Sequence, residues 1–582
     1  MDKLKALRQA MAARKLAAYL QPVHDEYLSE YPPACNQRVQ WLCGFSGSAG
    51  TAAGMQKKAA LFVDGRYTLQ AKNEVDGALF EQHNSGDKTP EAWLAENLSA
   101  KDRVGYDAKL YTKNMLARMK AALEKKGVEL VPVENLVDAI WADRPPAPSS
   151  PVFIHDMKYA GEESLSKRQR MAKQIAAAGA DACVIAAPDA VCWLLNIRGN
   201  DVPCTPLVLC TAVLYADGRV DLYVAPARCD AAVQKHLGKD VALCDPAKLE
   251  AGLKALKQKH VLCDPHSVPV WFTQILNDAG TKIIEGENPC FLAKAIKNPV
   301  ELQGMKNAHI RDGVAVVKLL CWVDRETPNR HVTELEISET LLELRASHEM
   351  FSEPSFPTIA GSGPNGAIVH YRVSPESNRT LKQGELLLLD SGGQYPDGTT
   401  DITRTMPIGT PTPEQIDCFT RVLKGHIAVA LARFPDGTSG SQLDALARQF
   451  LWQAGLDYDH GTGHGVGCFL GVHEGPQRIS KRGGDAKLSP GMIVSNEPGY
   501  YKTGEFGIRI ENLVAVVRQE NKFLAFETIT CVPIDTRLVD ADMLTPAEKN
   551  WLNAYHAWVL SKLSDELDEH ERLWLVARSA PI

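Results

Sequence analysis

The sequence has no excess of basic residues, no CxxC pair and no long apolar run. Its 64 lysines and arginines are outnumbered by 71 acidic residues, which argues against a nucleic-acid binder held by phosphate contacts. No apolar run reaches the roughly 18 residues that a membrane span requires. The first twenty residues alternate charged and apolar positions and lack the apolar stretch of a secretory signal. We expect a cytoplasmic protein with no nucleic-acid partner and no membrane association.

The 14 cysteines are scattered from Cys35 to Cys531 without a cluster, so we expect reduced thiols. Cys183 and Cys531 stand in apolar runs typical of buried positions. With 45% hydrophobic residues, the chain is too apolar to be disordered. A length of 582 residues predicts three or four domains, each large enough to bury a core without disulfides or metals.

Two segments of the first 300 residues repeat a faint pattern. Each has an amphipathic helix, a Trp-Leu pair beginning at Trp41 or Trp193, and an Asp-Gly-Arg triplet beginning at Asp64 or Asp217. Strand-like and helical runs alternate within each copy, as in α/β domains. We expect two such domains, residues 1–147 and 148–297, joined through the Pro-rich stretch 144–151.

The third region, residues 298–582, shows an internal symmetry of its own. Asn298 as N-cap and Pro299 at the first helical position predict its first long helix. A helix, a His-bearing loop and strands carrying Asp390 and Asp401 follow. The same order recurs after a second capped helix that begins at Thr412-Pro413, and its strands carry Glu497 and Glu511. Two similar halves, each donating two carboxylates, predict a polar site between them.

The carboxylates could each have a structural role. Asp390 ends a run of four leucines and could cap a turn, Asp401 could be exposed, and Glu511 could pair with Arg509. Burying an unpaired carboxylate costs several kcal/mol, however, so four inward carboxylates need cations. Together with His464 in a glycine-rich loop they form an oxygen-rich set suited to two divalent ions, Mn²⁺ or Co²⁺ first, with Zn²⁺ and Fe²⁺ left open.

Five motifs carry a resemblance to a known family. In chain order they are LLLLDSGGQYPDGTTDITRT, HGTGHGVG, VHEGP, SNEPGYY and GIRIEN. The sequence resembles the pita-bread metallopeptidases, and most closely the three-domain aminopeptidase P family. The resemblance implies two creatinase-like α/β N-terminal domains and a pita-bread catalytic domain with internal pseudo-twofold symmetry. It also implies a C-terminal extension from about Val539, similar to that of the long cytosolic members.

The resemblance implies a ligand set for two metal ions, in which Asp401 and Glu511 bridge. A hydroxide bridging the two ions would attack the scissile carbonyl, and Glu497 would pass a proton to the departing proline nitrogen. The implied ligands are Asp390, Asp401, His464, Glu497 and Glu511.

Further residues match positions that bind substrate in the family. A lone histidine is more often structural, but three of them cluster on loops around the ligands. His370 and His473 are expected to contact the substrate backbone and the oxyanion, and His460 to shape the proline pocket. We also expect substrate contacts from His464, Tyr501, Arg509 and Arg66.

Two of these residues have alternative roles. Arg509 is expected to orient Glu511, because strand alternation puts both on one face. Arg66 could instead belong to a strand-ending turn, because the second domain repeats its triplet at Asp217-Gly218-Arg219.

The predicted activity is release of the N-terminal residue from peptides with proline second, by a homodimeric enzyme. The nearest alternative is a prolidase, which cleaves only Xaa-Pro dipeptides, and two front domains favour the aminopeptidase. A non-catalytic pita-bread module that binds peptides or histones is the other alternative, and the complete ligand set disfavours it. An apolar stripe in the tail is expected to pack on the catalytic domain or on a second subunit: Trp551, Leu552, Tyr555, Trp558, Val559 and Leu563.

Overall fold

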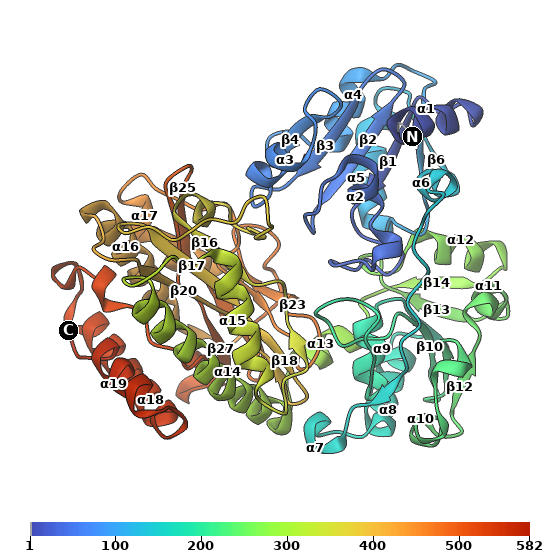
Figure 1. The fold of residues 1–582 in the computed structure, drawn as a ribbon. Helices are drawn as coiled ribbons and strands as arrows, with labels where there is room; N and C mark the ends of the chain where they lie inside the picture. Colours follow the sequence, from blue (N-terminus) through green and yellow to red (C-terminus); the bar gives the residue numbers. More distant parts are fainter. Residues whose placement is uncertain (1–2) are drawn as a thin grey trace. The chain divides into compact units, whose positions relative to one another are not determined.

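A computed structural model describes residues 3–582. The chain forms two compact units, and the first comprises residues up to 156 together with 162–291. The second comprises residues 157–161 and 292–582. Figure 1 shows the elements of each unit. Among the described residues, no helix is long and apolar enough to cross a membrane.

The first unit contains two six-stranded sheets of the same topology. The first has the order β4 (Glu81–Asn84), β3 (Ala59–Val63), β2 (Gly50–Met55), β1 (Ala18–Pro22), β5 (Arg103–Tyr106) and β6 (Glu129–Pro132). The second has β12 (Val241–Cys244), β11 (Val220–Tyr223), β10 (Thr211–Tyr215), β8 (Ala182–Ile185), β13 (His260–Cys263) and β14 (Lys282–Glu285). In both sheets, the second and third pairings in this order are antiparallel, and the other three pairings are parallel.

The helices of this unit repeat in the same way. Trp41 lies in α2 (Arg38–Cys43) and Trp193 in α9 (Pro188–Leu195), and the copies open with α1 (Lys3–Ala13) and α8 (Ser164–Ala177). The predicted pair of α/β domains is therefore confirmed. The other elements of the unit are α3 (Thr68–Glu74), α4 (Pro90–Asn97), α5 (Lys113–Glu124), α6 (Leu136–Ile140), β7 (Phe153–Ile154), β9 (Ile197–Arg198), α10 (Ala231–Leu237), α11 (Leu249–Lys254) and α12 (Val270–Asp278).

The second unit begins its two halves with long capped helices. Asn298 and Glu301 form a capping box at α14 (Pro299–Glu326), and Thr412 and Gln415 form another at α16 (Pro413–Ala430). Shorter helices follow each of them, α15 (Glu334–Ala346) and α17 (Asp444–Trp452). The remaining helices are α7 (Met157–Ala160), α13 (Pro289–Ala295), α18 (Pro546–Leu563) and α19 (Glu569–Arg578).

Each half places its carboxylates in, or directly next to, one antiparallel strand pair. In the first half β17 (Leu386–Ser391) pairs with β20 (Ile402–Pro407), and in the second β24 (Ile493–Asn496) pairs with β27 (Asn512–Arg518). This is the predicted internal symmetry. The other strands are β15 (Glu353–Pro354), β16 (Ile359–Ser362), β18 (Gly393–Tyr395), β19 (Gly398–Thr399), β21 (Arg433–Pro435), β22 (Gly463–Gly465), β23 (Glu474–Ile479), β25 (Gly499–Lys502), β26 (Phe506–Arg509) and β28 (Phe523–Thr528).

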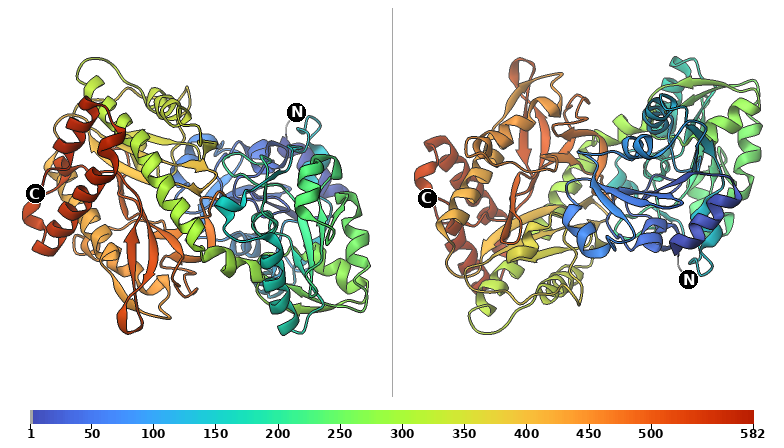
Figure 2. Two further views of the ribbon diagram at one scale, coloured as in Figure 1. Left: turned by 90° about the horizontal axis from the view of Figure 1, so that it is seen from below. Right: turned by 90° about the horizontal axis from the view of Figure 1, so that it is seen from above.

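The C-terminal helices belong to the core of the second unit. α18 contacts α14 and α16, and α19 contacts α14 (Figure 2). Leu552, Tyr555 and Val559 are buried in the same cluster as Leu386 and Leu389 of β17. Of the two alternatives for the apolar stripe, the structure therefore supports packing on the catalytic domain.

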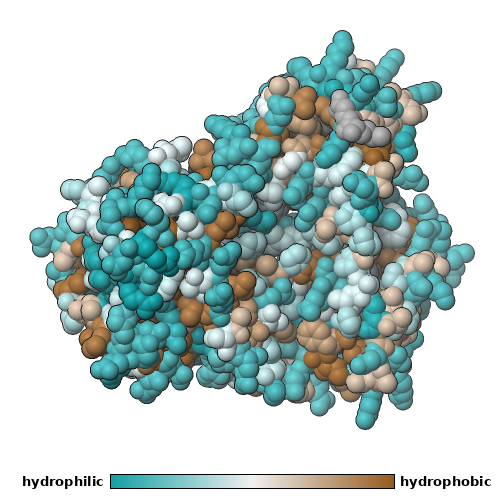
Figure 3. Space-filling model, viewed as in Figure 1, coloured by the Kyte–Doolittle hydropathy of each residue, from teal (hydrophilic) through white to brown (hydrophobic). Residues whose placement is uncertain are grey.

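One face of the surface is mainly hydrophilic, and the cysteines are not paired in disulfides, as the composition and the cysteine spacing predict. Hydrophilic side chains dominate the face shown in Figure 3, with apolar ones scattered among them. Leu573 and Val576 of α19 are exposed. The 14 cysteines, all within the described residues, form no disulfide, and Cys183 and Cys531 are buried as predicted.

Candidate metal centre and active site

Strand pairing brings the carboxylates of the two halves together. Asp390 stands opposite Thr403 in the β17–β20 pair. The Thr403 hydroxyl donates a hydrogen bond to Glu511 Oε2 at 2.7 Å, and the Glu511 amide donates to the Thr403 carbonyl oxygen at 3.2 Å. A carboxylate of the second half is thus fastened to a strand of the first half.

A cluster of candidate metal ligands forms around His464. Ligand atoms of Asp401, His464 and Glu511 all lie within 4.8 Å of one another. His464 Nε2 is 3.4 Å from Asp401 Oδ2 and 3.5 Å from Glu497 Oε1. His464 Nδ1 lies 2.9 Å from the Gly465 carbonyl oxygen, which fixes the proton on Nδ1 in the neutral ring. The lone pair of Nε2 therefore faces the carboxylates, as a metal ligand requires.

The charges of this cluster shift several pKa values. Burial raises the pKa of Asp390 to about 6, although the Arg509 guanidinium opposes the shift. Burial, then the charges of Asp401 and Glu497, hold the pKa of Glu511 well above its usual range. Burial alone would lower the pKa of His464, but the same two carboxylates raise it to about 9. Without cations, the cluster retains protons to limit its own repulsion.

Two buried oxygens of the cluster fit a metal site. Asp390 Oδ1 and Glu511 Oε1 accept no hydrogen bond from the residues that the structure describes. A buried acceptor without a partner costs about 1–3 kcal/mol, and more when it is charged. Divalent cations would supply the missing partners, since carboxylate oxygens and one imidazole are ligands that Mn²⁺ accepts.

The glycine-rich loop lets His464 approach the strand that leads to Glu497. A Cβ on Gly463 would lie 1.9 Å from the Ser495 carbonyl oxygen, so only glycine fits there. The Ser495 hydroxyl accepts from the His464 amide at 2.9 Å and donates to Glu497 Oε1 at 3.2 Å. Ser495 thus holds two candidate ligands in place. The sequence did not predict this role, because no motif singles out Ser495.

Arg509 was expected to orient Glu511, and it reaches that residue through the Thr403 hydroxyl, while its other bonds lead elsewhere. Arg509 Nη2 donates to Asp390 Oδ2 at 2.6 Å, and Nη1 donates to the Tyr501 hydroxyl at 2.5 Å. The chain leaves β26 at Arg509 and enters β27 at Asn512. Strand alternation therefore does not extend from Arg509 to Glu511. Arg509 also connects Asp390 with Tyr501.

The candidate substrate residues of the second unit lie around the cluster. His460 Nε2 is 2.8 Å from the Tyr501 hydroxyl. The rings of His464 and His473 meet edge to face, with centroids 4.2 Å apart. The carbonyl oxygen of Val369, next to His370, accepts from Arg509 Nη2 at 3.2 Å. These contacts bring together segments that lie far apart in the sequence.

Arg66 belongs to the other unit and has a local partner. Its guanidinium pairs with Asp64 at 2.7 Å, two residues away. Arg219 pairs with Asp217 at 2.9 Å in the repeated triplet of the second domain. The shared pair is what the turn interpretation expects, and a substrate contact of Arg66 stays a prediction.

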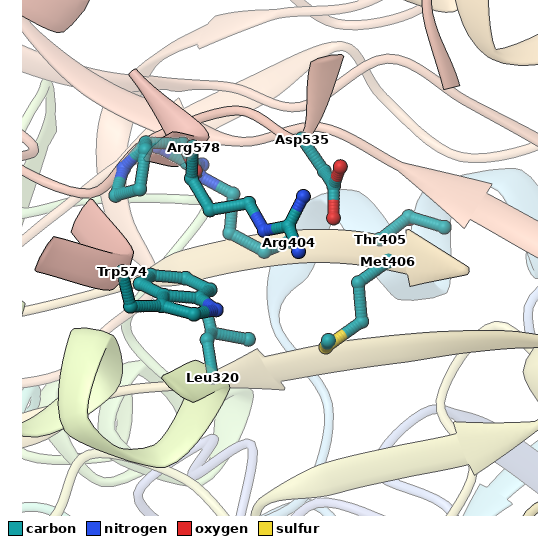
Figure 4. A pocket seen from close by; sticks show the side chains of 8 residues that line it. Leu320, Arg404, Thr405, Met406, Asp535, Trp574 and Arg578 are labelled. Atoms are coloured by element: carbon teal, nitrogen blue, oxygen red, sulfur yellow. The ribbon is translucent and has the colours of Figure 1, made fainter. Parts of the chain in front are cut away.

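A buried arginine, Arg404, contacts the backbone of the cluster, and the sequence did not predict this contact. Arg404 donates to the carbonyl oxygen of Glu511 at 2.6 Å and to the Tyr555 hydroxyl of α18 at 2.9 Å. Figure 4 shows the small pocket beside it, where Arg404 lies with Trp574 and Arg578 of α19. The C-terminal helices therefore contribute to the backbone position of one carboxylate.

Four protein-family models match consecutive segments that together cover nearly the whole chain. Residues 303–518 match metallopeptidase family M24, and residues 522–582 match the C-terminal region of peptidase M24. Residues 3–140 and 143–301 each match a creatinase/prolidase N-terminal domain. The fold and the matches define an M24 metallopeptidase with two creatinase-type domains in front of the catalytic domain.

Similarity to individual proteins narrows the assignment. The chain is 41% identical to aminopeptidase P2 of Arabidopsis thaliana over all of its length and 88% of that protein. It matches the crystal structure of X-prolyl aminopeptidase from Caenorhabditis elegans with a TM-score of 0.95, 34% identity and coverage of 100% and 99% of the two chains. That protein is described as a cytosolic enzyme with a di-nuclear active site. The chain belongs to the aminopeptidase P family.

A dipeptidase of the same fold is less similar. Dipeptidase PepE from Mycobacterium ulcerans matches with a TM-score of 0.52 and 27% identity. It covers 66% of this chain while 98% of its own length is matched. About a third of the chain therefore has no counterpart in that dipeptidase.

Proposed function

We propose that the chain releases the N-terminal residue from peptides whose second residue is proline, using two divalent cations. Asp390, Asp401, His464, Glu497 and Glu511 would hold the cations. The observation that carries this proposal is the meeting of buried carboxylates from two halves of the chain around His464 Nε2. Full-length similarity to X-prolyl aminopeptidases supports the substrate class.

The chemistry needs a nucleophile and a proton carrier. When bound, a pair of divalent cations lowers the pKa of water and polarises a carbonyl oxygen. Glu497 would accept the proton of the attacking water and deliver it to the departing proline nitrogen, which has no hydrogen of its own in the peptide. Its position 3.5 Å from His464 Nε2, beside the cluster, supports this role.

The histidines would bind the reacting peptide bond. His473 lies edge to face with His464, so a donor on its ring is close to any carbonyl that reaches the cluster. We assign His473 and His370 to the negative charge that develops on the carbonyl oxygen.

The row of His460, Tyr501 and Arg509 would form one wall of the proline pocket. Continuous hydrogen bonds from His460 Nε2 to Asp390 support it. Arg66 is retained as a proposed contact to the peptide.

Several finer features are part of the proposal. Mn²⁺ is the proposed metal, because the ligands are mostly carboxylate oxygens. A homodimer is proposed, supported by Leu573 and Val576 on the surface of α19. A cytoplasmic location is supported by the described C. elegans enzyme. The proposed domains are residues 1–147, 148–297 and 298–582, with an extension from about Val539.

The test compares three peptides, Arg-Pro-Pro, Arg-Pro and Arg-Ala-Ala, with metal-stripped protein before and after addition of Mn²⁺. We expect Mn²⁺ to restore release of Arg from Arg-Pro-Pro, with little release from the other two. Cleavage of Arg-Pro alone would instead identify a prolidase. Absence of cleavage with every divalent metal would favour a peptide-binding module.

A further inference from the structure

A buried carboxylate on the first long helix, α14, accepts four side-chain hydrogen bonds. Asp312 of α14 is fully buried and receives two bonds from Arg345 of α15, at 2.7 and 2.9 Å. The Tyr395 hydroxyl donates to its Oδ1 at 2.8 Å, and the Thr400 hydroxyl donates to its Oδ2 at 2.9 Å. Four charge-assisted bonds saturate this carboxylate and fix its position.

Two branches of this network end beside candidate metal ligands. Thr400, which donates to Asp312, immediately precedes Asp401. Ser391 immediately follows Asp390, and its hydroxyl accepts from Arg345 Nη2 at 3.1 Å. The Asp312–Arg345 pair therefore holds the neighbours of both carboxylates that the first half supplies.

The loop between Asp390 and Asp401 is closed by hydrogen bonds between Gly393 and Thr400. The Gly393 amide donates to the Thr400 hydroxyl at 2.8 Å, and the Thr400 amide donates to the Gly393 carbonyl oxygen at 2.9 Å. A Cβ on Gly392 would lie 1.9 Å from the Thr400 carbonyl oxygen, so the two ends of the loop are in close contact. A shift of Thr400 would thus move both ligands.

The second half repeats this arrangement at an equivalent position. Asp312 lies thirteen residues beyond Pro299, the first residue of α14, and His426 lies thirteen residues beyond Pro413, the first residue of α16. His426 Nδ1 is 3.0 Å from the Asn496 carbonyl oxygen, and Nε2 is 3.2 Å from Asn512 Nδ2. Asn496 immediately precedes Glu497, and Asn512 immediately follows Glu511.

The neutral ring of His426 suits both bonds. Nδ1 donates to the carbonyl oxygen of Asn496, and Nε2 accepts from the side-chain amide of Asn512. The Asn496 amide group returns a bond to the His426 carbonyl oxygen at 2.9 Å. One side chain therefore joins the two strand ends from which Glu497 and Glu511 project.

We propose that Asp312, with Arg345, and His426 are a pair of positioning residues, each fixing the two candidate metal ligands of its own half from the centre of a long helix. They touch neither substrate nor metal and act through Ser391, Thr400, Asn496 and Asn512. The inference rests on the proposed metal set. Buried ion pairs contribute little net stability, so ligand placement is the role that the Asp312–Arg345 geometry favours.

The test in the first half uses two substitutions that each remove one hydrogen bond to the same carboxylate. Thr400→Val breaks the branch that leads to Asp401, and Tyr395→Phe breaks one that leads to no ligand neighbour. The dissociation constant of Mn²⁺ is measured by calorimetry on the metal-free full chain, together with its unfolding midpoint. We expect Thr400→Val to weaken Mn²⁺ binding about tenfold or more, and Tyr395→Phe to weaken it less than about threefold.

The second half offers a similar comparison. His426 and His556 are both buried histidines of the second unit, and His556 Nε2 accepts from the Ile534 amide, away from the cluster. His426→Leu should weaken Mn²⁺ binding, whereas His556→Leu should lower the unfolding midpoint without that loss. Equal effects within either pair on Mn²⁺ affinity would overturn the proposal.

The binding readout separates this inference from the proposed function. Wild-type protein that binds Mn²⁺ but hydrolyses no Xaa-Pro peptide would contradict the substrate assignment alone, and the variant comparison would still decide the positioning role. Wild-type protein that binds no divalent cation would overturn both.

Discussion

The hydroxyl of Thr403 donates to Glu511 Oε2, across 108 residues of sequence. This bond joins the strand that follows Asp401 to a carboxylate of the other half. Thr403 also accepts from Arg509 Nε at 3.2 Å. One small side chain therefore stands between the two halves of the candidate centre.

Replacing Thr403 by Val should weaken metal binding while the protein still folds. The substitution leaves Glu511 Oε2 without its donor, and we expect Mn²⁺ binding to weaken about tenfold, with about 1–3 kcal/mol less stability. Thr405→Val is the matched control, because Thr405 lies on the same strand and its hydroxyl donates to the Arg509 carbonyl oxygen. An equal loss of Mn²⁺ affinity in both variants would contradict a specific role of Thr403.

Replacing Arg509 by Gln should shift the pH dependence of metal binding. The positive charge of Arg509 opposes the raised pKa of Asp390, so its loss should raise that pKa further. Because Asp390 must lose its proton to bind a cation, half-maximal Mn²⁺ binding should move to higher pH. Calorimetric titrations between pH 5 and 8 would measure this shift. Arg219→Gln, in the front domain, should leave the profile unchanged, and an unshifted profile in Arg509→Gln would refute the argument.

Metal-free protein should lose stability as the pH rises. The folded-state pKa of Asp390 is raised to about 6 and that of His464 to about 9, both above their usual values. Their stabilising contributions are complete below the unfolded-state values and are lost as the pH passes through the folded-state values. Added Mn²⁺ should therefore raise the unfolding midpoint more at pH 8.5 than at pH 5.5. A rise that is larger at pH 5.5 would exclude these groups as metal ligands.

Replacing His473 by Gln should lower turnover more than substrate binding. If His473 stabilises the charge that develops on the carbonyl oxygen, kcat should fall about 10²-fold or more, while KM changes little. Steady-state rates with Arg-Pro-Pro would measure both constants. His260→Gln in the front domain is the control, because His260 is partly exposed at a strand end. A change confined to KM would assign His473 to substrate binding only.

Local signals in the sequence predicted much of the fold. Asn298 and Thr412 were identified as helix caps because capping depends on a few neighbouring residues, and each forms a capping box. The repeated Trp-Leu pairs and Asp-Gly-Arg triplets predicted two similar α/β domains for a similar reason. Burial of Asp390 followed from the leucines that precede it.

Contacts between distant segments could not be predicted. The direct bond of Arg509 to Asp390 depends on where the chain turns between β26 and β27, and strand alternation did not predict it. Ser495, Thr403, Asp312 and His426 carry common residue types without a motif, and their partners lie on other elements. Such hydrogen bonds follow from tertiary packing, which a periodic pattern does not encode.

The contact between Tyr555 and Arg404 has a consequence for shortened forms of the chain. Tyr555 lies only 27 residues from the C-terminus, yet its hydroxyl accepts from a guanidinium that also holds the carbonyl oxygen of Glu511. A premature stop codon or a splice variant that removed α18 would open this end of the core and leave Arg404 facing solvent. The five motifs would all still be translated, but the product would lose the support that α18 gives, through Arg404, to the backbone of Glu511.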